Sequence, residues 1–105
     1  MFLQTLFYLL GVHFLCDYPL QGDFLARAKA EGPLRLWHLF GHSMIHGLGV
    51  AIVTHSVVLG VCETVMHMII DYGKTRKMTT FGQDQALHVA CKVIWAMHVW
   101  IGGAL

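Results

Sequence analysis

Histidine and aspartate recur four residues apart within segments that are otherwise apolar. The sequence holds four polar pairs at this spacing, which are His13/Asp17, His38/His42, His67/Asp71 and Asp84/His88. Residues four apart share one face of a helix, so each pair places two polar side chains next to each other. Neutral imidazole and carboxylate groups are good ligands for Zn, Mn or Fe. The spacing therefore predicts a divalent-metal site assembled from several helices.

Lipid, more than water, is expected to cover this chain. Its hydrophobic fraction is 56% and its charged fraction is 12%, whereas an average soluble domain is about one quarter charged. The length of 105 residues leaves room for one domain. A net charge of +1 and the lack of a long basic run give no basis for nucleic-acid binding.

The sequence predicts an all-α, polytopic membrane protein with four transmembrane helices arranged as two hairpins in a single domain, 1–105. The apolar run from Leu36 to Ile70 would be about 50 Å long as one helix, whereas a bilayer core is about 30 Å thick. We therefore expect a tight turn at 54–56. Pro19 is expected to end the first helix, and Asp84 to cap the start of the last. The helices are expected at about 2–18, 34–53, 57–72 and 84–103, with an interfacial segment at about 21–33.

Basic residues predict the orientation of these helices. Three lie between the first helix and the first turn of the second (Arg27, Lys29 and Arg35) and three between the third and fourth helices, whereas both termini and the turn at 54–56 hold none. By the positive-inside rule, both basic segments are expected in the cytoplasm. The predicted location is the bacterial inner membrane, with both termini on the non-cytoplasmic side.

This topology brings the four polar pairs to one level near the cytoplasmic face, where they are expected to form one site. The spacing leaves room for one ion or two. Asp84 or Glu63 is the candidate general base, and Gln21, Lys29 and Lys74 are candidates for binding an anionic substrate group. The candidate metal ligands are His13, Asp17, His38, His42, His67, Asp71 and His88.

Each of these residues also has a simpler interpretation. An isolated His/Asp pair can be an ion pair within a helix or a hydrogen bond between helices. His46 extends the second pair and is an open case, while His98 is expected to be a packing residue and Lys92 to extend its ammonium toward water. The tryptophans are expected at the membrane interface or in packing, and the cysteines as small apolar residues: Trp37, Trp95, Trp100, Cys16, Cys62 and Cys91.

The chain contains two similar seven-residue segments. Residues 12–18 and 66–72 both read as an apolar residue, His, three residues, Asp and Tyr, and each is followed by a basic segment and a His-bearing helix. This pattern is typical of a parallel repeat of two hairpins, which some membrane folds use.

These motifs resemble a small uncharacterised family of integral membrane proteins from bacteria and their phages, often compared with membrane-bound metal-dependent hydrolases. The resemblance runs from the first helix to the last. It implies an inner-membrane protein whose polar positions are its functional set. The residues that carry it are His13, Asp17, Gln21, Lys29, His38, His42, His67, Ile70, Asp71, Tyr72, Lys74, Asp84, Gln85 and His88.

The hypothesis that follows is a metal-dependent hydrolase acting on a lipid-linked or phosphorylated substrate. Membrane lipid is the expected partner. The first alternative is a non-enzymatic membrane protein, structural or interacting, phage-encoded and homo-oligomeric, in which the pairs only hold helices together. The others are a haem carrier with axial ligands such as His42 and His88, and an ion or proton path.

Overall fold

The computed structural model describes residues 1–18 and 20–102, and this part of the chain is all-α, as expected, with no strand. Its five helices are α1 (Phe2–Asp17), α2 (Gly22–Ala28), α3 (Arg35–Thr54), α4 (Val57–Thr75) and α5 (Phe81–Trp100). The four long helices match the expected segments closely. α2 is a short helix within the expected interfacial segment. The role given to Pro19 and the predicted helix end at residue 103 lie outside the described residues.

The last helix begins three residues earlier than expected, and Asp84 is not its N-terminal cap. The hydroxyl of Thr80 accepts a hydrogen bond from the Gln83 backbone N–H at 3.1 Å, and the Gln83 side chain accepts one from the Thr80 N–H at 2.9 Å. This reciprocal pair is a capping box. Asp84 therefore lies one turn inside the helix, where it is buried.

The expected turn between α3 and α4 is present at residues 54–56. His55 has a left-handed backbone (φ 57°) that reverses the chain. Ser56 then caps α4, since its hydroxyl accepts a hydrogen bond from the Leu59 N–H at 3.1 Å. The two helices it joins pack closely. A Cβ atom on Gly47 would lie 2.6 Å from the Gly60 carbonyl oxygen, so the small residues set this distance.

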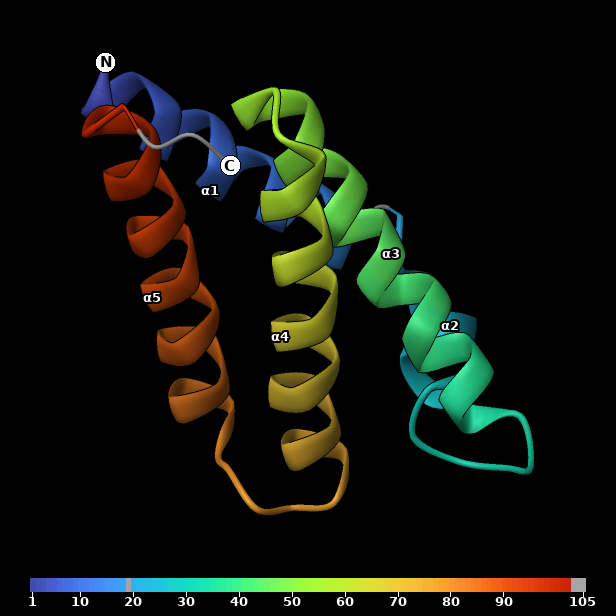
Figure 1. Ribbon diagram of the computed structural model, residues 1–105. Helices are drawn as coiled ribbons and strands as arrows, with labels where there is room; N and C mark the ends of the chain where they lie inside the picture. The colour runs from blue at the N-terminus through green and yellow to red at the C-terminus, as the bar shows by residue number, and fades with distance from the viewer. Residues whose placement is uncertain (19, 103–105) are drawn as a thin grey trace.

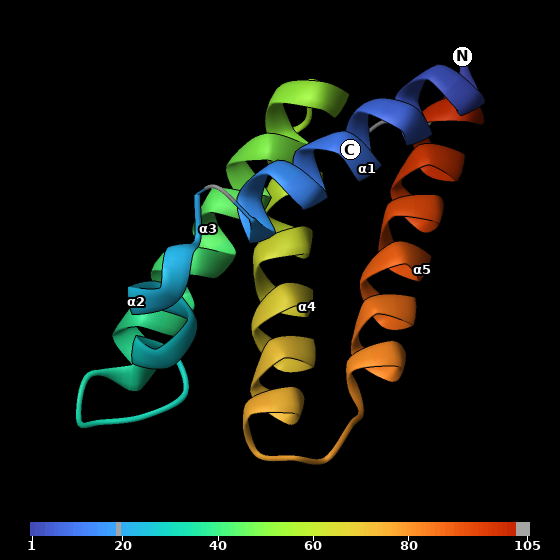
Figure 2. The same cartoon turned by 180° about the vertical axis from the view of Figure 1, so that it is seen from behind.

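The helices form a bundle in which α1 crosses obliquely behind α3, α4 and α5 (Figures 1 and 2). α1 packs against both α3 and α5, and α4 packs against both of these helices. The start of α1, the end of α5 and the α3–α4 turn lie at one end (Figure 1). The basic loops before α3 and after α4 lie at the opposite end (Figure 1).

The interior passes from an apolar layer to a polar layer in steps of four residues. Near the termini, Leu9, Val50, Leu59 and Ala96 form the hydrophobic core. One helical turn further toward the basic loops, each helix continues the same buried face with a polar residue. The four steps are Leu9 to His13, Val50 to His46, Leu59 to Glu63 and Ala96 to Lys92.

The outer faces of the helices are apolar. α4 exposes a stripe of β-branched residues at spacings of four, which are Val57, Val61, Val65 and Ile69. By length and composition, α3 is long and apolar enough to cross a membrane, and among the described helices it alone meets both conditions; α1 is apolar but shorter.

Candidate metal centre

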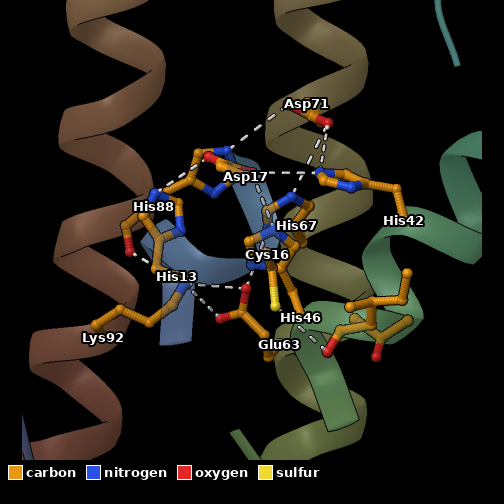
Figure 3. A network of polar contacts seen from close by, with 12 residues as sticks. His13, Cys16, Asp17, His42, His46, Glu63, His67, Asp71, His88 and Lys92 are labelled. Carbon is orange, nitrogen blue, oxygen red and sulfur yellow. Dashed lines mark hydrogen bonds and ion pairs between the residues drawn. The ribbon is translucent and has the colours of Figure 1, made fainter. Parts of the chain in front are cut away.

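Five buried histidines and four carboxylates converge between α1, α3, α4 and α5 (Figure 3). The imidazole of His67 lies at their centre. Its ring centroid is 3.8 Å from that of His46, 4.2 Å from that of His88 and 5.0 Å from that of His42. Side chains from four helices therefore share one buried space.

The first group of possible ligands surrounds Asp17. Its Oδ1 lies 3.0 Å from His46 Nε2 and 3.4 Å from His42 Nε2, and His67 completes a set whose ligand atoms all lie within 4.8 Å of one another. Ligands at about 2.1 Å from a tetrahedral metal ion stand about 3.4 Å apart. These separations therefore suit a shared cation.

The second group contains Asp71, Asp84 and His88. His88 Nε2 lies 3.5 Å from Asp84 Oδ1 and 3.8 Å from Asp71 Oδ1. The other Asp71 oxygen, Oδ2, lies 3.7 Å from His42 Nε2 in the first group. Asp71 therefore stands between the two groups and turns one oxygen toward each.

Several buried atoms in these groups have no hydrogen-bond partner in the described structure. They include His42 Nε2, His67 Nε2, His88 Nε2 and Asp84 Oδ1. Leaving a buried polar atom unsatisfied costs about 1–3 kcal/mol. A divalent cation would satisfy these atoms, so the residues present fit a metal ion.

Glu63 lies on the side of the cluster nearer the termini and is held by three neighbours. Lys92 Nζ donates to both carboxylate oxygens at 3.0 Å, and Trp95 Nε1 donates to Oε1 at 2.9 Å. Oε2 also accepts a hydrogen bond from His67 Nδ1 at 3.1 Å. A carboxylate that holds one imidazole nitrogen fixes the other nitrogen toward a metal. These contacts favour an orienting role for Glu63 over that of general base.

His13 lies beside the two groups and belongs to neither. Its Nε2 is 3.2 Å from Gln85 Oε1 and 3.4 Å from Asp17 Oδ2. Gln85 in turn donates to Asp84 Oδ2 at 3.1 Å. His13 and Gln85 therefore connect a carboxylate of the first group to one of the second.

His38 is the expected ligand that lies apart from the cluster. It is half-buried, and its ring stands edge-on to Phe24 at 5.6 Å. Among the described residues it belongs neither to the two groups above nor to a third set of possible ligands, Glu63, His67 and His88. His38 and His42 share a helical face only approximately. The helical turn of α3 that carries His38 faces α2, whereas the next helical turn, which carries His42, faces the cluster.

Three residues of this network were missed or left open by the sequence reasoning. His46 is a ligand candidate, and its spacing of four from His42 was the available signal. Lys92 is buried, with 1% exposure, and does not extend toward water. Trp95 donates a hydrogen bond inside the bundle. No local pattern indicated the contacts of Glu63 with Lys92 and Trp95, which lie 29 and 32 positions away along the chain.

A pocket of about 130 Å³ opens above the second group toward the basic loops. Lys29 Nζ lies 2.6 Å from Asp71 Oδ2, and the Lys74 ammonium lies over the Phe81 ring at 4.8 Å. All three residues expected to bind substrate are in its wall. The lining residues are Asp17, Tyr18, Gln21, Lys29, Asp71, Lys74, Phe81, Asp84 and Gln85.

A protein family described as "Protein of unknown function (DUF3307)" matches residues 5–104. No curated protein and no solved structure matches the chain. The expected membership of an uncharacterised family is thus confirmed, and the comparison with metal-dependent hydrolases stays a hypothesis. The family description assigns no chemistry to the residues above.

Proposed function

The chain belongs to the DUF3307 family of proteins of unknown function, and from that premise we propose that it is an integral membrane protein with a divalent-metal centre that hydrolyses a phosphorylated or lipid-linked substrate. Zn, Mn and Fe suit the ligand types. The cation would lie between α1, α3, α4 and α5, below the pocket that opens toward the basic loops.

The position of Asp71 between two ligand groups is the observation that supports the metal centre most directly. Its two oxygens lie 3.7 Å from His42 Nε2 and 3.8 Å from His88 Nε2. A carboxylate that turns one oxygen to each of two ligand groups is suited to bridge two metal ions. Two-metal sites hold both the attacking and the leaving oxygen during phosphoryl transfer.

The distribution of polar residues supports four membrane spans. In α4 the buried face carries Glu63, His67 and Asp71, while the exposed face carries the apolar stripe from Val57 to Ile69. This is the reverse of a helix in water, and intramembrane ionisable residues typically face the bundle interior. A hydropathy average over α4 or α5 includes these inward residues, so it understates how apolar the lipid-facing surface is.

The placement of basic residues supports the proposed orientation. Both basic loops lie at the end of the bundle where the pocket opens (Figure 1). By the positive-inside rule this is the cytoplasmic end. We place the protein in the bacterial inner membrane with both termini on the other side.

A metal ion in this centre would supply an activated water molecule and positive charge beside a phosphoryl group. Asp84 is the proposed general base, since it lines the pocket and its buried Oδ1 has no hydrogen-bond partner among the described residues. In this role Asp84 receives the proton, and Asp71 and His88 remain to hold the cation. In the reaction the water oxygen bonds to phosphorus, the P–O bond to the alcohol breaks, and the water proton passes through Asp84 to the leaving alkoxide. Gln21, Lys29 and Lys74 would contact the substrate.

A non-enzymatic role in membrane structure or interaction is the second candidate. It is favoured by ion pairs that join different helices, Glu63–Lys92 between α4 and α5 and Asp71–Lys29 between α4 and the end of α2. In that case alanine at Asp17 or His42 would lower stability without changing metal content. A haem carrier fits less well, because the 130 Å³ pocket is smaller than the roughly 300 Å³ of small cofactor sites.

Metal analysis of the detergent-purified protein tests the metal centre. We expect stoichiometric Zn, Mn or Fe in the wild type and loss of that metal in Asp71→Ala. Asp23→Ala is the matched control, since Asp23 is exposed on α2. Metal absent from the wild type, or present equally in Asp71→Ala, would eliminate the metal centre. Release of phosphate from a synthetic phosphomonoester by the metal-loaded protein tests the hydrolase assignment separately.

A further inference from the structure

The pocket above the metal centre holds opposed charges. Asp17, Asp71 and Asp84 line it together with Lys29 and Lys74. Without a cation, the three carboxylates outnumber the two ammonium groups. One or two divalent ions bound to the carboxylates would reverse this balance and make the pocket attractive to an anion.

Lys29 is the group whose position depends most on this balance. Its Nζ contacts Asp71 Oδ2 at 2.6 Å, which is the same oxygen that faces His42 in the first ligand group. A metal ion that binds this oxygen takes over the negative charge that Lys29 now neutralises. Lys29 would then be available to an anion in the same pocket.

Lys29 can change partners without release of α2. The backbone carbonyl of Ala30, the next residue, accepts a hydrogen bond from the Arg76 guanidinium at 2.6 Å. This second contact ties the end of α2 to the end of α4 independently of Asp71. The lysine side chain can therefore move while its backbone stays in place.

The size of the pocket restricts the anion. A volume of about 130 Å³ holds about four water molecules, which is enough for a phosphate group and too little for the rest of an organic phosphate. The remainder of the substrate must extend beyond the mouth. Two apolar side chains of the pocket lining, Tyr18 and Phe81, are exposed, so an apolar remainder would lie against them.

We infer that Lys29 and Lys74 form a metal-gated subsite for the terminal phosphate of an amphiphilic phosphomonoester, with Lys29 exchanging Asp71 for the phosphate when metal binds. This inference rests on the proposed metal centre and adds to it the substrate class and the order of binding. Metal binding prepares the pocket, and the phosphate follows.

The first measurement is metal affinity, by equilibrium dialysis of the full chain in lipid nanodiscs with Zn²⁺ or Mn²⁺. Lys29→Met should bind the metal about three- to tenfold more tightly, because no ammonium competes for Asp71. Lys77→Met, an exposed lysine outside the pocket, should bind as the wild type does. Unchanged or weaker metal binding by Lys29→Met would overturn the exchange.

The second measurement is anion binding by the same proteins, with and without metal. Inorganic phosphate should bind the metal-loaded wild type at least about tenfold more tightly than the metal-free form. Lys29→Met should lose most of this binding, and Lys29→Arg should keep it. A phosphate affinity that is the same with and without metal, or that is unchanged in Lys29→Met, would contradict the subsite.

The source of the phosphate is resolved with nanodiscs of two compositions. Phosphatidic acid, a membrane phosphomonoester, should displace inorganic phosphate, whereas phosphatidylcholine, a blocked diester, should not. Equal displacement by both lipids would overturn the proposed class. If the wild type binds no metal, the proposed function itself is wrong. If it binds metal but Lys29→Met changes neither metal affinity nor phosphate affinity, only this inference is wrong.

Discussion

Lys92 and Glu63 form an ion pair enclosed by the bundle, with Lys92 Nζ 3.0 Å from both carboxylate oxygens and each side chain 1% exposed. Removing one partner of such a pair leaves a buried charge without compensation, which costs about 3–5 kcal/mol. We expect Lys92→Met to lower the thermal midpoint of the detergent-solubilised protein strongly. The double variant Lys92→Met/Glu63→Gln should recover most of the loss.

Lys77→Met is the control for this experiment, since Lys77 is exposed and outside the network. It should leave the midpoint unchanged. A single Lys92→Met variant as stable as this control would show that the ion pair does not contribute to the bundle.

His46 and His38 differ sharply in their expected contribution to metal binding, although both flank His42 at a spacing of four. His46 Nε2 lies 3.0 Å from Asp17 Oδ1, whereas His38 packs on Phe24. His46→Ala should weaken metal affinity more than about tenfold, and His38→Ala should change it little, as measured by competition with a chromogenic chelator. The opposite ranking would show that the first ligand group is misassigned.

The helices and most of the candidate metal centre follow from local rules. Polar residues four positions apart share one face of a helix. The thickness of the bilayer's hydrocarbon core limits the length of a span and so predicts where the chain turns. Those rules place Asp17, His42, His67, Asp71 and His88 on the inward faces that the structure shows.

The remaining features depend on contacts between distant residues. Glu63 has an orienting position because Lys92 and Trp95 reach it from another helix, and no local pattern indicates that pairing. His38 lies away from the cluster because α2 packs against the start of α3. The Thr80 cap is different, because its Thr-x-x-Gln signal is local and competes with the cap predicted at Asp84.

Gly47 is expected to tolerate no larger residue. A Cβ atom there would meet Gly60 O at 2.6 Å and the Thr64 side chain even more closely. Gly47→Val should therefore force α3 and α4 apart, with a loss of about 1–3 kcal/mol or more. The change in midpoint can be measured by thermal denaturation in detergent.

Gly41 provides the control on the same helix, because a Cβ atom there meets no atom of the described residues within 4 Å. Gly41→Ala should be neutral or stabilise the protein by up to about 1 kcal/mol, since alanine favours the helix. Equal effects of the two substitutions on the thermal midpoint would mean that the close α3–α4 contact does not restrict the size of the side chain at Gly47.

Metal removal should lower stability by the amount that binding contributes. At a free metal concentration about 100 times the dissociation constant, binding to the folded state alone adds about 2.7 kcal/mol. A chelator should therefore shift the wild-type midpoint downward, and added Zn²⁺ or Mn²⁺ should restore it. Asp17→Asn should show little response to either treatment, while Asp23→Asn should respond as the wild type does. A wild type insensitive to chelator would contradict a structural contribution of the metal.

Two exposed positions at opposite ends of the bundle test the proposed orientation. His55 and Lys77 both have a left-handed backbone, with φ of 57° and 61°, so a cysteine at either position meets the same conformational constraint. His55 lies in the turn at the same end as the start of α1 and the end of α5, and Lys77 lies in the basic loop at the other end (Figure 1). In intact cells an impermeant thiol reagent should label His55→Cys above the background of the three native cysteines, and it should label Lys77→Cys only after the inner membrane is opened. The reverse pattern would invert the orientation, and labelling of both positions in intact cells would place the two ends on the same side of the membrane, which four spans in this bundle do not permit.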